Sequence, residues 1–408
     1  MARLSANQRI NLTIMVAALG YFVDVFDIIL FPVVRVESLQ ALGLSPEQIT
    51  SAGATILNWQ MAGMLLGGIA WGMLGDKRGR VQVLFGTILL YSLGSIANAF
   101  VFDVPTYAAA RFVTGFGLAG EIGAGITLVM ELLPKEKRSY AATIVATCGV
   151  IAPAVAALVG GAVNWRWLYV AGGVLGLLLL LLRVSVNESG LFHQIKKKQH
   201  VGLGKFYMLF TDRQRLMRYI FSIISATPIW FVVGILVIFT PEIGAALNVS
   251  EPLKAPTSVI SYTIGIGMGG LLSGLLSQFF CNRKKVMAFF LLGVALTSGC
   301  ILTARGISAP GFYALILLDG VFIGYWTLFL TTTAELFGTN LRATATTSAS
   351  NFVRASVIIF TSLITALQAD MGFLASVQIT AAMCFIAAGL ALWRLPETFA
   401  RDLDFIEG

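Results

Sequence analysis

The stretch Glu131-Leu-Leu-Pro-Lys-Glu-Lys-Arg138 has a counterpart in Glu335-Leu-Phe-Gly-Thr-Asn-Leu-Arg342, half of the 408-residue chain further along. In both copies a glutamate and an apolar pair precede a turn, and an arginine follows the glutamate after seven positions. Each copy ends one long apolar segment and precedes another. This repeat predicts a chain of two similar halves, and repeated halves in a membrane chain place a binding site between them.

The composition predicts that the chain lies in a membrane. Hydrophobic residues make up 57% of it and charged residues 12%, against about 25% charged residues in soluble domains, and the mean hydropathy is +0.84. A helix needs about 20 apolar residues to cross a bilayer. We therefore predict an all-α membrane protein of twelve transmembrane helices in two sets of six. The predicted spans are 11–36, 50–75, 81–102, 106–130, 139–162, 166–186, 217–243, 256–280, 286–304, 310–334, 343–367 and 371–394.

Basic residues predict the orientation of these helices. With a cytoplasmic N-terminus, most lysines and arginines between the spans fall in cytoplasmic loops, whereas the outer loops hold only Arg35, Arg166, Lys254 and Arg305. This asymmetry follows the positive-inside rule. We predict a multi-pass protein of the plasma membrane, the inner membrane of a bacterium, with both termini in the cytoplasm.

The polar stretch in the middle of the chain predicts the domain boundaries. Residues 1–190 form the first six-helix bundle, residues 191–216 a basic cytoplasmic linker, and residues 217–408 the second bundle. Lysines and arginines in the linker suit contact with anionic lipid of the inner leaflet. Because the net charge of +8 arises from basic residues on one side of the membrane, it predicts membrane lipid and not nucleic acid as a partner.

The cysteines and histidines favour neither a metal site nor a cofactor. The four cysteines, Cys148, Cys281, Cys300 and Cys384, lack the paired spacing of metal sites and redox motifs. Both histidines lie in the central polar stretch, which excludes a histidine relay within the membrane. We expect no metal, no cofactor and no enzymatic activity, and we expect a monomer.

The short loop after the second predicted span reads Gly72-Met-Leu-Gly-Asp76-Lys-Arg-Gly79-Arg80. Glycines there allow close approach of helix ends, although a plain tight turn is the alternative interpretation. The pattern resembles the G-x-x-x-D-x-x-G-R signature of the major facilitator superfamily, and it implies that fold, with two pseudo-symmetric six-helix bundles. The corresponding loop of the second half has Gln278 where the signature has aspartate, so we expect no symmetric gate. The predicted gating residues are Gly72, Asp76, Gly79, Arg80, Glu131, Arg138, Glu335 and Arg342.

Further motifs are spread over nearly the whole chain. They are Arg111-Phe-Val-Thr-Gly-Phe-Gly-Leu-Ala-Gly-Glu121, Asn187-Glu-Ser189, Pro396-Glu-Thr398 and the two glutamate–arginine repeats. They resemble the branch of that superfamily that contains sugar porters, organic-ion transporters and aromatic-acid/proton symporters. Asp24-Val-Phe-Asp27 is similar to the D-G-x-D of aromatic-acid symporters, with valine in place of glycine. Residues 226–231 lack the paired glutamines of sugar porters, so a sugar is a less favoured substrate.

Charged residues inside the predicted spans mark candidate proton sites, because such charges are costly in a membrane. Asp27 lies about 6 Å and Arg111 about 8 Å from the outer face of a core about 30 Å thick, so the two can pair. Asp24 shares the Asp27 face one turn deeper. The pair is either a permanent salt bridge or a carboxylate that exchanges Arg111 for a proton. Glu121, about 15 Å further inward, either binds a proton or accepts a hydrogen bond from a neighbouring helix.

Arg354 is the candidate for binding substrate. It lies about 17 Å into its span, close to the midplane, where transporters hold their substrates, and a guanidinium can hold a carboxylate through two hydrogen bonds. Organic-anion transporters of the resembling branch have a basic residue at this place. The alternative is that Asp319, at about 14 Å from the outer face, neutralises it. The predicted substrate-binding residues are Arg354, Asp319, Asn58, Gln60, Trp230, Tyr262, Tyr325, Trp326 and Asn351.

These predictions describe a secondary active transporter. It moves a small organic anion, a carboxylate, together with protons, by alternating access between the two bundles. One alternative is an uncoupled facilitator or exchanger of another small solute, such as a sugar or an organic cation. The other is a membrane receptor that kept the fold and lost transport.

Overall fold

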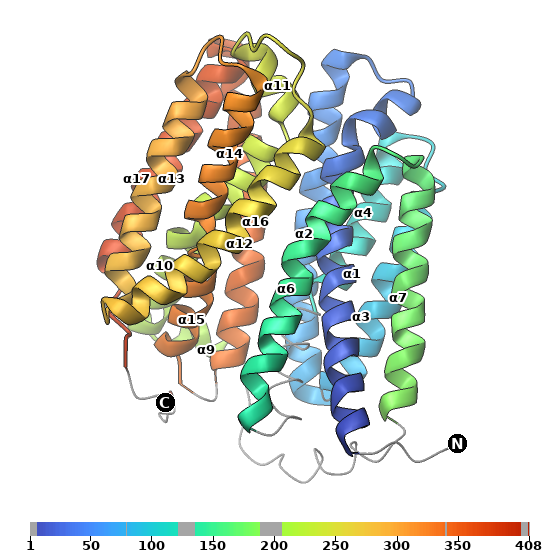
Figure 1. Ribbon diagram of the computed structural model, residues 1–408, viewed down its shortest axis with the longest axis vertical. Helices are drawn as coiled ribbons and strands as arrows, with labels where there is room; N and C mark the ends of the chain where they lie inside the picture. Colours follow the sequence, from blue (N-terminus) through green and yellow to red (C-terminus); the bar gives the residue numbers. More distant parts are fainter. Residues whose placement is uncertain are drawn as a thin grey trace.

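The computed structural model describes residues 6–78, 80–120, 135–187, 206–338, 341–400 and 407. Every regular element among these residues is a helix, and two groups of long helices stand side by side (Figure 1). The first group is α1 (Ala6–Ala41), α2 (Pro46–Arg78), α3 (Arg80–Asn98), α4 (Val104–Leu118), α6 (Lys135–Gly160) and α7 (Trp165–Asn187). The second is α9 (Met208–Thr211), α10 (Arg213–Phe231), the π-helix η2 (Val232–Val237), α11 (Thr240–Ala246), α12 (Ala255–Phe279), α13 (Arg283–Thr303), α14 (Ala309–Ile323), α15 (Trp326–Leu336), α16 (Arg342–Met371) and α17 (Phe373–Arg394).

The helices correspond to the twelve predicted spans in order. The first six spans are α1, α2, α3, α4, α6 and α7, with the fourth described as far as Gly120. The seventh comprises α10, η2 and α11, and the tenth comprises α14 and α15. Among the described residues, seven helical stretches are long and apolar enough to cross a membrane. They are 165–182, 213–237, 255–279, 283–303, 309–336, 344–371 and 373–394.

Two of the predicted spans are interrupted helices. In the seventh, the α-helix changes to a π-helix at Val232 and breaks at Phe239, before α11 begins at Thr240. In the tenth, α14 ends before Gly324, where a Cβ atom would lie 2.2 Å from the carbonyl carbon of Gly269. Glycine is required there because the backbone of α12 crosses the end of α14 at that point.

The boundary between the last two helices differs from the prediction. The predicted eleventh span ends at residue 367, but α16 continues to Met371, and Gly372 alone separates it from α17. Gly372 has φ +81°, a left-handed conformation that favours glycine. The polar residues Gln368 and Asp370 form the last turn of α16, so hydropathy ends the span before the helix ends.

Side-chain caps define several helix starts. Asp103, Asp212 and Asn282 each accept a hydrogen bond of 2.8 Å from the backbone N–H three residues later, at the starts of α4, α10 and α13. Each bond satisfies a backbone donor that a helix start leaves without a partner. Proline follows near the start of α4, α11, α12 and α14, where its missing N–H has no cost.

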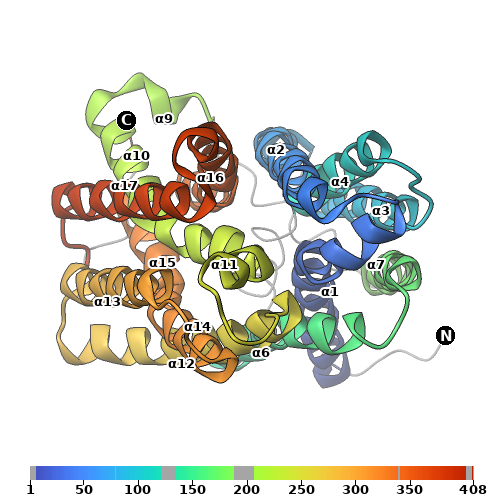
Figure 2. The ribbon, with the colours of Figure 1, turned by 90° about the horizontal axis from the view of Figure 1, so that it is seen from above.

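Packing within and between the two groups fixes the architecture. Within the groups, α1 packs on α6 and α7, α2 on α4, α12 on α14, and α10 on α17. Between the groups, α2 packs on α16 and α6 on α12, as the view from above shows (Figure 2). The α2–α4 contact requires Gly115, where a Cβ atom would lie 2.2 Å from the backbone oxygen of Gln60.

The molecule is apolar outside and carries charge inside. Leu158, Leu181, Leu271, Phe279 and Trp393 each have more than 60% of their surface exposed. A soluble protein would not expose so many large apolar side chains on long helices, whereas a bilayer covers them. Hydrogen bonds inside the helices satisfy the backbone in lipid, and the chain is a multi-pass membrane protein.

Candidate functional site

Five buried charged side chains define the candidate site. Asp24 and Asp27 of α1, Arg111 of α4, Asp319 of α14 and Arg354 of α16 are each at most 6% exposed. Because a charge inside a membrane is costly unless a partner meets it, the neighbours of each side chain indicate what it does.

Asp27 and Arg111 form a buried ion pair, which the similar depths of their helix positions allow. Arg111 Nη1 lies 3.3 Å from Asp27 Oδ1, and Arg111 Nη2 donates to the backbone oxygen of Asp27 at 3.0 Å. The Ser95 hydroxyl donates to the same carboxylate oxygen at 3.3 Å. Arg111 Nε donates to Gln60 Oε1 at 3.3 Å. Gln60, predicted as a substrate ligand, therefore belongs to this network.

Aromatic rings enclose the Asp27–Arg111 pair. The Arg111 guanidinium lies 5.6 Å from the centre of the Tyr169 ring and 6.0 Å from that of Phe31. The hydroxyl oxygens of Tyr169 and Tyr107 are 2.7 Å apart. The rings exclude water, so the attraction between the two charges is stronger than at a surface. A proton on Asp27 would remove most of that attraction and free Arg111 to move.

Arg354 has no ion-pair partner among the described residues. Its Nη1 donates one long hydrogen bond, 3.4 Å, to Asn351 Oδ1, and its Nε has no hydrogen-bond partner there. The guanidinium lies 5.7 Å from the ring centre of Trp230 and 5.9 Å from that of Trp326. A buried guanidinium with donors to spare, beside two aromatic rings, can accept an anion with an aromatic or apolar body.

Residues of α1 face Arg354 from the other group of helices. Tyr21 and Asp24 both lie close enough to Arg354 to interact with it electrostatically, and of the two only Asp24 can carry a charge near neutral pH. Tyr21 packs against Gly149 of α6, where a Cβ atom would lie 1.9 Å from the Tyr21 ring. The two aspartates of α1 therefore act on different arginines: Asp27 pairs with Arg111 in its own group, and Asp24 acts on Arg354 in the other group.

Polar contacts join the two groups of helices above and below Arg354. Asn58 of α2 accepts a hydrogen bond of 2.7 Å from Thr361 of α16. One turn before Arg354, Asn351 donates to the backbone oxygen of Ala119 at 3.2 Å. Gly68 lies against Asn351 and leaves room for it, because a Cβ atom there would lie 2.6 Å from the Asn351 amide nitrogen. Asn58 and Asn351, both predicted to bind substrate through hydrogen bonds, therefore join the two groups of helices.

A further ion pair joins the groups at the face opposite Ala6 and Arg394, the first and last residues of the transmembrane helices. Arg35 Nη1 of α1 lies 2.7 Å from Glu242 Oε1 of α11, and Arg35 Nη2 donates to Glu242 Oε2 at 2.9 Å. Thr50 donates to the same glutamate at 3.2 Å. Arg35 is fully buried, so this contact closes the space between the groups on that face.

A cavity of about 400 Å³ opens beside this ion pair, between α2, α11, α16 and α17. Glu47, Thr50, Phe239, Glu242 and Thr361 are among its lining residues. Because Thr361 also bonds to Asn58, the cavity reaches a contact between the groups that lies about 10 Å from Arg354 along α16.

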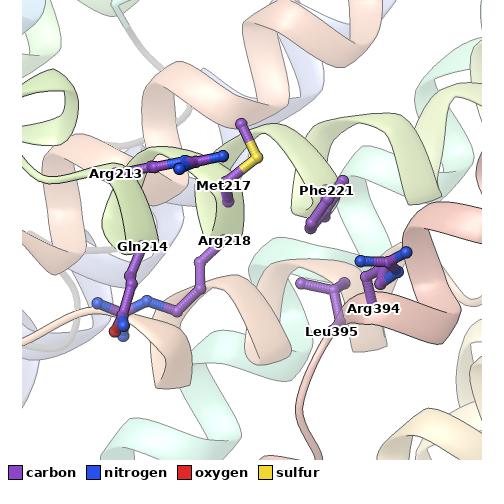
Figure 3. A pocket seen from close by; sticks show the side chains of 7 residues that line it. All are labelled: Arg213, Gln214, Met217, Arg218, Phe221, Arg394 and Leu395. Atoms are coloured by element: carbon purple, nitrogen blue, oxygen red, sulfur yellow. The ribbon is translucent and has the colours of Figure 1, made fainter.

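A second cavity, of about 430 Å³, lies where α10 begins and α17 ends. Figure 3 shows Arg213, Met217, Phe221 and Arg394 around it. None of the predicted substrate or proton residues lines this cavity. Among the described residues, no group of three or more His, Cys, Asp or Glu side chains is placed to hold a metal ion.

Asp319 does not meet Arg354, so the alternative that Asp319 neutralises Arg354 is wrong. Asp319 Oδ2 accepts a hydrogen bond of 2.9 Å from Ser298, and Asp319 Oδ1 is hydrogen-bonded to Thr297. Both hydroxyls belong to α13. Depth along the membrane gives the height of a residue but not the side of its helix on which it lies, and Asp319 lies between α14 and α13.

The remaining predicted aromatic residues take different places. Tyr325 is fully buried at the break between α14 and α15, and its hydroxyl donates to the backbone oxygen of Ser225 at 3.0 Å. Tyr262 is buried in α12, whose backbone lies against Gly320 of α14. Of the four predicted aromatic residues, Trp230 and Trp326 are the two that contact Arg354.

Several predicted residues fall outside what the structure describes. Glu121, predicted to bind a proton, lies outside the described residues, as do Gly79 and Glu131 of the gating set. For four other gating residues the structure gives only a helical position in α2, α3 or α6: Gly72, Asp76, Arg80 and Arg138. Their roles stay predictions.

The structure describes the glutamate–arginine repeat of the second half, which lies at the face that holds Ala6 and Arg394. Glu335 Oε1 of α15 accepts a hydrogen bond of 2.6 Å from Arg283 of α13. Arg342 donates from Nε to a backbone oxygen of α15 at 2.9 Å. Glu397 accepts from the backbone N–H groups of Arg283 and Lys284 at 3.1 and 3.0 Å. The two motifs thus converge on the first turn of α13.

Sequence reasoning missed four residues that contribute to this arrangement: Tyr21, Arg35, Ser95 and Glu242. Tyr21 precedes Asp24 by three positions and shares its helix face, which was a usable signal. Arg35 and Glu242 lie near the ends of predicted spans, where a charge is ordinarily explained by contact with lipid headgroups. The serine carries no signal of its own.

Comparison with known proteins identifies the family of this chain. A family model described as the Major Facilitator Superfamily matches residues 17–360. The 3-(3-hydroxy-phenyl)propionate transporter of Escherichia coli is 27% identical over 69% of this chain and 72% of its own. The gentisate transporter of Corynebacterium glutamicum is 23% identical over 80% of this chain and 75% of its own.

A solved structure shows the same fold. The crystal structure of a D-xylose-proton symporter matches with a TM-score of 0.70 and 19% identity, covering 95% of this chain and 98% of that one. The likeness confirms the predicted fold of twelve helices in two pseudo-symmetric bundles. Because the family model spans most of the chain, this protein belongs to the major facilitator superfamily, whose members are transporters and not enzymes.

Proposed function

We propose that this protein is a proton-coupled symporter that carries a small aromatic carboxylate by alternating access. One observation carries the proposal: Arg354 is a buried guanidinium without an ion-pair partner among the described residues, and two tryptophan rings flank it. An anionic substrate is the counter-charge that such a group requires.

The chemistry of the Arg354 surroundings favours an aromatic acid over other anions. A carboxylate can bind two guanidinium N–H groups in parallel, while the body of the substrate stacks on Trp230 or Trp326. Two relatives carry names that specify aromatic carboxylates, 3-(3-hydroxy-phenyl)propionate and gentisate. A sugar would leave the guanidinium without a counter-charge, and an organic cation would be repelled by it.

The Asp27–Arg111 pair is the proposed site of proton coupling. When a proton binds Asp27, the charge attraction to Arg111 is lost, and the contact between α1 and α4 is weakened. When the proton leaves, the pair re-forms. Ionised Asp27 holds α1 to α4 through Arg111. Transport therefore requires that the proton and the substrate cross in the same step.

Asp24 links the proton to the substrate in this proposal. Its charge acts on Arg354, and it lies three residues before Asp27 on the same face of α1. In the empty transporter Asp24 partly compensates the charge of Arg354. A proton on Asp24 leaves Arg354 available to the carboxylate of the substrate.

The proposed location is the inner membrane of a bacterium, with the face on which α1 begins and α17 ends in the cytoplasm. Basic residues between the spans gather on the side of the termini, as the positive-inside rule requires. The Arg35–Glu242 pair then closes the outer face. We propose residues 1–190 and 217–408 as the two bundles that rock against each other, joined by a linker against anionic lipid.

Uptake by purified protein in liposomes tests the proposal. Labelled gentisate should accumulate when the pH is lower outside than inside, and a protonophore should abolish the accumulation. Cyclohexanecarboxylate tests the need for an aromatic ring, and benzamide tests the need for a charge. Counterflow without accumulation would identify an uncoupled facilitator or exchanger. Binding without counterflow would identify a receptor, and sugar uptake would refute the carboxylate.

A further inference from the structure

Asp319 is a fully buried carboxyl that the proposed transport cycle does not use. It lies on α14, and its two oxygens contact the hydroxyls of Ser298 and Thr297 on α13. Both hydroxyls are neutral groups, so neither can compensate a negative charge. This sets Asp319 apart from Asp27, whose carboxylate is paired with Arg111.

Among the described residues, no charge of a neighbouring helix faces Asp319. The described elements that pack most closely on α14 are α12, α13 and η2. Helix α12 and η2 contain no Asp, Glu, Lys, Arg or His, and α12 contributes one titratable group, the neutral phenol of Tyr262. The charges of α13 lie in its first turn, 283–285, about 20 Å along the helix from Ser298. Glu335 of the adjoining α15 is paired with Arg283.

The hydrogen bonds around Asp319 can accommodate a hydrogen on Oδ1. A hydroxyl has a single hydrogen to donate. Thr297 Oγ1 lies 2.8 Å from the backbone oxygen of Gly293, and it also contacts Asp319 Oδ1. If the threonine donates to Gly293, its contact with Asp319 is a hydrogen bond only when Oδ1 carries a hydrogen. Ser298 then donates to Oδ2 at 2.9 Å, and every group is satisfied.

We propose that Asp319 is a further proton-binding carboxyl, held as the neutral acid, which fastens α14 to α13. In this state Asp319 Oδ1 donates to Thr297, Thr297 donates to Gly293, and Ser298 donates to Asp319 Oδ2. Removing the proton leaves a charge with no cation of the described neighbouring helices close to it, which is costly in a membrane. Loss of the proton therefore weakens the contact between α14 and α13.

The position of Asp319 gives this proton a consequence for transport. Helix α14 ends at Ile323, and after the break at Gly324 the next helix begins with Trp326, which contacts Arg354. The neutral Asp319 fixes the helix before the break, and the break allows Trp326 to shift with the substrate relative to α14. The inference goes beyond the proposed function, because it holds whichever solute Arg354 binds.

Infrared spectroscopy of the purified protein tests the protonation state directly. A protonated carboxyl has a C=O stretching band that an ionised carboxylate lacks. We expect this band in the wild type at neutral pH and in Asp370→Asn, an exposed carboxyl of α16 that serves as the control. In Asp319→Asn the intensity of this band should fall by the contribution of one carboxyl. If Asp319→Asn instead removes intensity only from the carboxylate bands, Asp319 is ionised and the proposal is wrong.

Thermal unfolding in detergent as a function of pH gives a second test. Only the folded state holds the proton on Asp319 at neutral pH, so the folded protein binds more protons than the unfolded one, and stability falls as pH rises. The decline should be smaller in Asp319→Asn than in the wild type or Asp370→Asn, by up to about tenfold in the unfolding equilibrium per pH unit. Identical pH profiles in all three would overturn the proposal.

Thr297→Val keeps the test decisive if Asp319→Asn does not fold. Valine removes the hydroxyl that accepts the Asp319 hydrogen, while the carboxyl itself remains. The C=O band should then persist and shift, because the acid has lost its acceptor. An unshifted band in folded Thr297→Val would show that Asp319 does not donate to Thr297, which contradicts the proposal.

Discussion

Arg35 and Glu242 form a two-point ion pair, with contacts of 2.7 and 2.9 Å, that joins α1 to α11 across the two bundles. The pair lies at the face opposite the termini, and Phe239 lies below the guanidinium at 4.7 Å. Two hydrogen bonds join the bundles deeper in the molecule, one between Asn58 and Thr361 and one between Asn351 and Ala119. The described residues therefore join the bundles on both sides of Arg354, and opening the far face requires that Arg35 and Glu242 separate.

Glu242→Gln should open the far face more often. Glutamine keeps the size of the side chain but removes the charge, and a hydrogen bond to a charged group contributes about 1.5–3 kcal/mol. A cysteine introduced at Ala54, which lines the cavity beside the pair, should react about tenfold faster with a membrane-impermeant thiol reagent in a background without native cysteines. Glu47→Gln, at an exposed carboxylate of the same cavity, is the control. Equal rates in both variants would exclude the pair as a gate.

Asp27→Asn should separate proton coupling from substrate exchange. The variant cannot ionise, so uphill uptake driven by a pH gradient should be abolished, whereas counterflow, which needs no net proton movement, should persist in part. Asp103→Asn is the control, because Asp103 is a helix cap outside the membrane spans and asparagine also caps helices well. Proton-driven accumulation by Asp27→Asn would remove Asp27 from the coupling mechanism and leave Asp24 or Glu121.

Arg354→Ala should lose most of the affinity for a carboxylate substrate. Removing one member of a buried charge pair costs on the order of 2–5 kcal/mol, which calorimetric titration of the detergent-purified protein would measure. Arg354→Lys should recover little, because lysine lacks the planar fork of donors. Since Asp319 is bonded to α13 and not to Arg354, adding Asp319→Ala should not restore stability. Wild-type affinity in Arg354→Ala would show that Arg354 does not bind the carboxylate.

Glu397 should make stability depend on acid pH. Burial works to raise the pKa of this carboxyl, but four backbone N–H groups at the start of α13 and after the glutamate itself hold its pKa below its usual range. The stabilisation is therefore present above the ordinary pKa of a glutamate and is lost as pH falls through the lowered value. Glu397→Ala should cost about 1 kcal/mol at neutral pH.

Thermal unfolding over acid pH checks the Glu397 prediction. The difference in stability between the wild type and Glu397→Ala should shrink as the pH falls, because the wild-type carboxylate becomes protonated and accepts hydrogen bonds less well. Glu37→Ala, at an exposed carboxyl of α1, should show no such convergence. A difference that stays constant with pH would mean that the side chain acts through packing and not through its charge.

The sequence determined the membrane class, the number and order of the helices, and the heights of the buried charges. Hydropathy and the thickness of a bilayer are sufficient for this, because they act along one direction, the membrane normal. The same one-dimensional argument gave Asp27 and Arg111 similar depths, and these two side chains are within ion-pair distance in the structure. Hydropathy gave the wrong end for α16, because the helix continues through polar residues beyond the predicted apolar span.

Only the tertiary structure decided which residues at a given height meet. Asp319 and Arg354 have similar predicted depths, yet Asp319 lies against Thr297 and Ser298 while Arg354 lies between Trp230 and Trp326. The side of a helix that faces a neighbour depends on which helices pack together and how they are rotated, and these are long-range contacts. For the same reason Arg35 and Glu242, more than 200 positions apart in the chain, carry no sequence signal of their pairing.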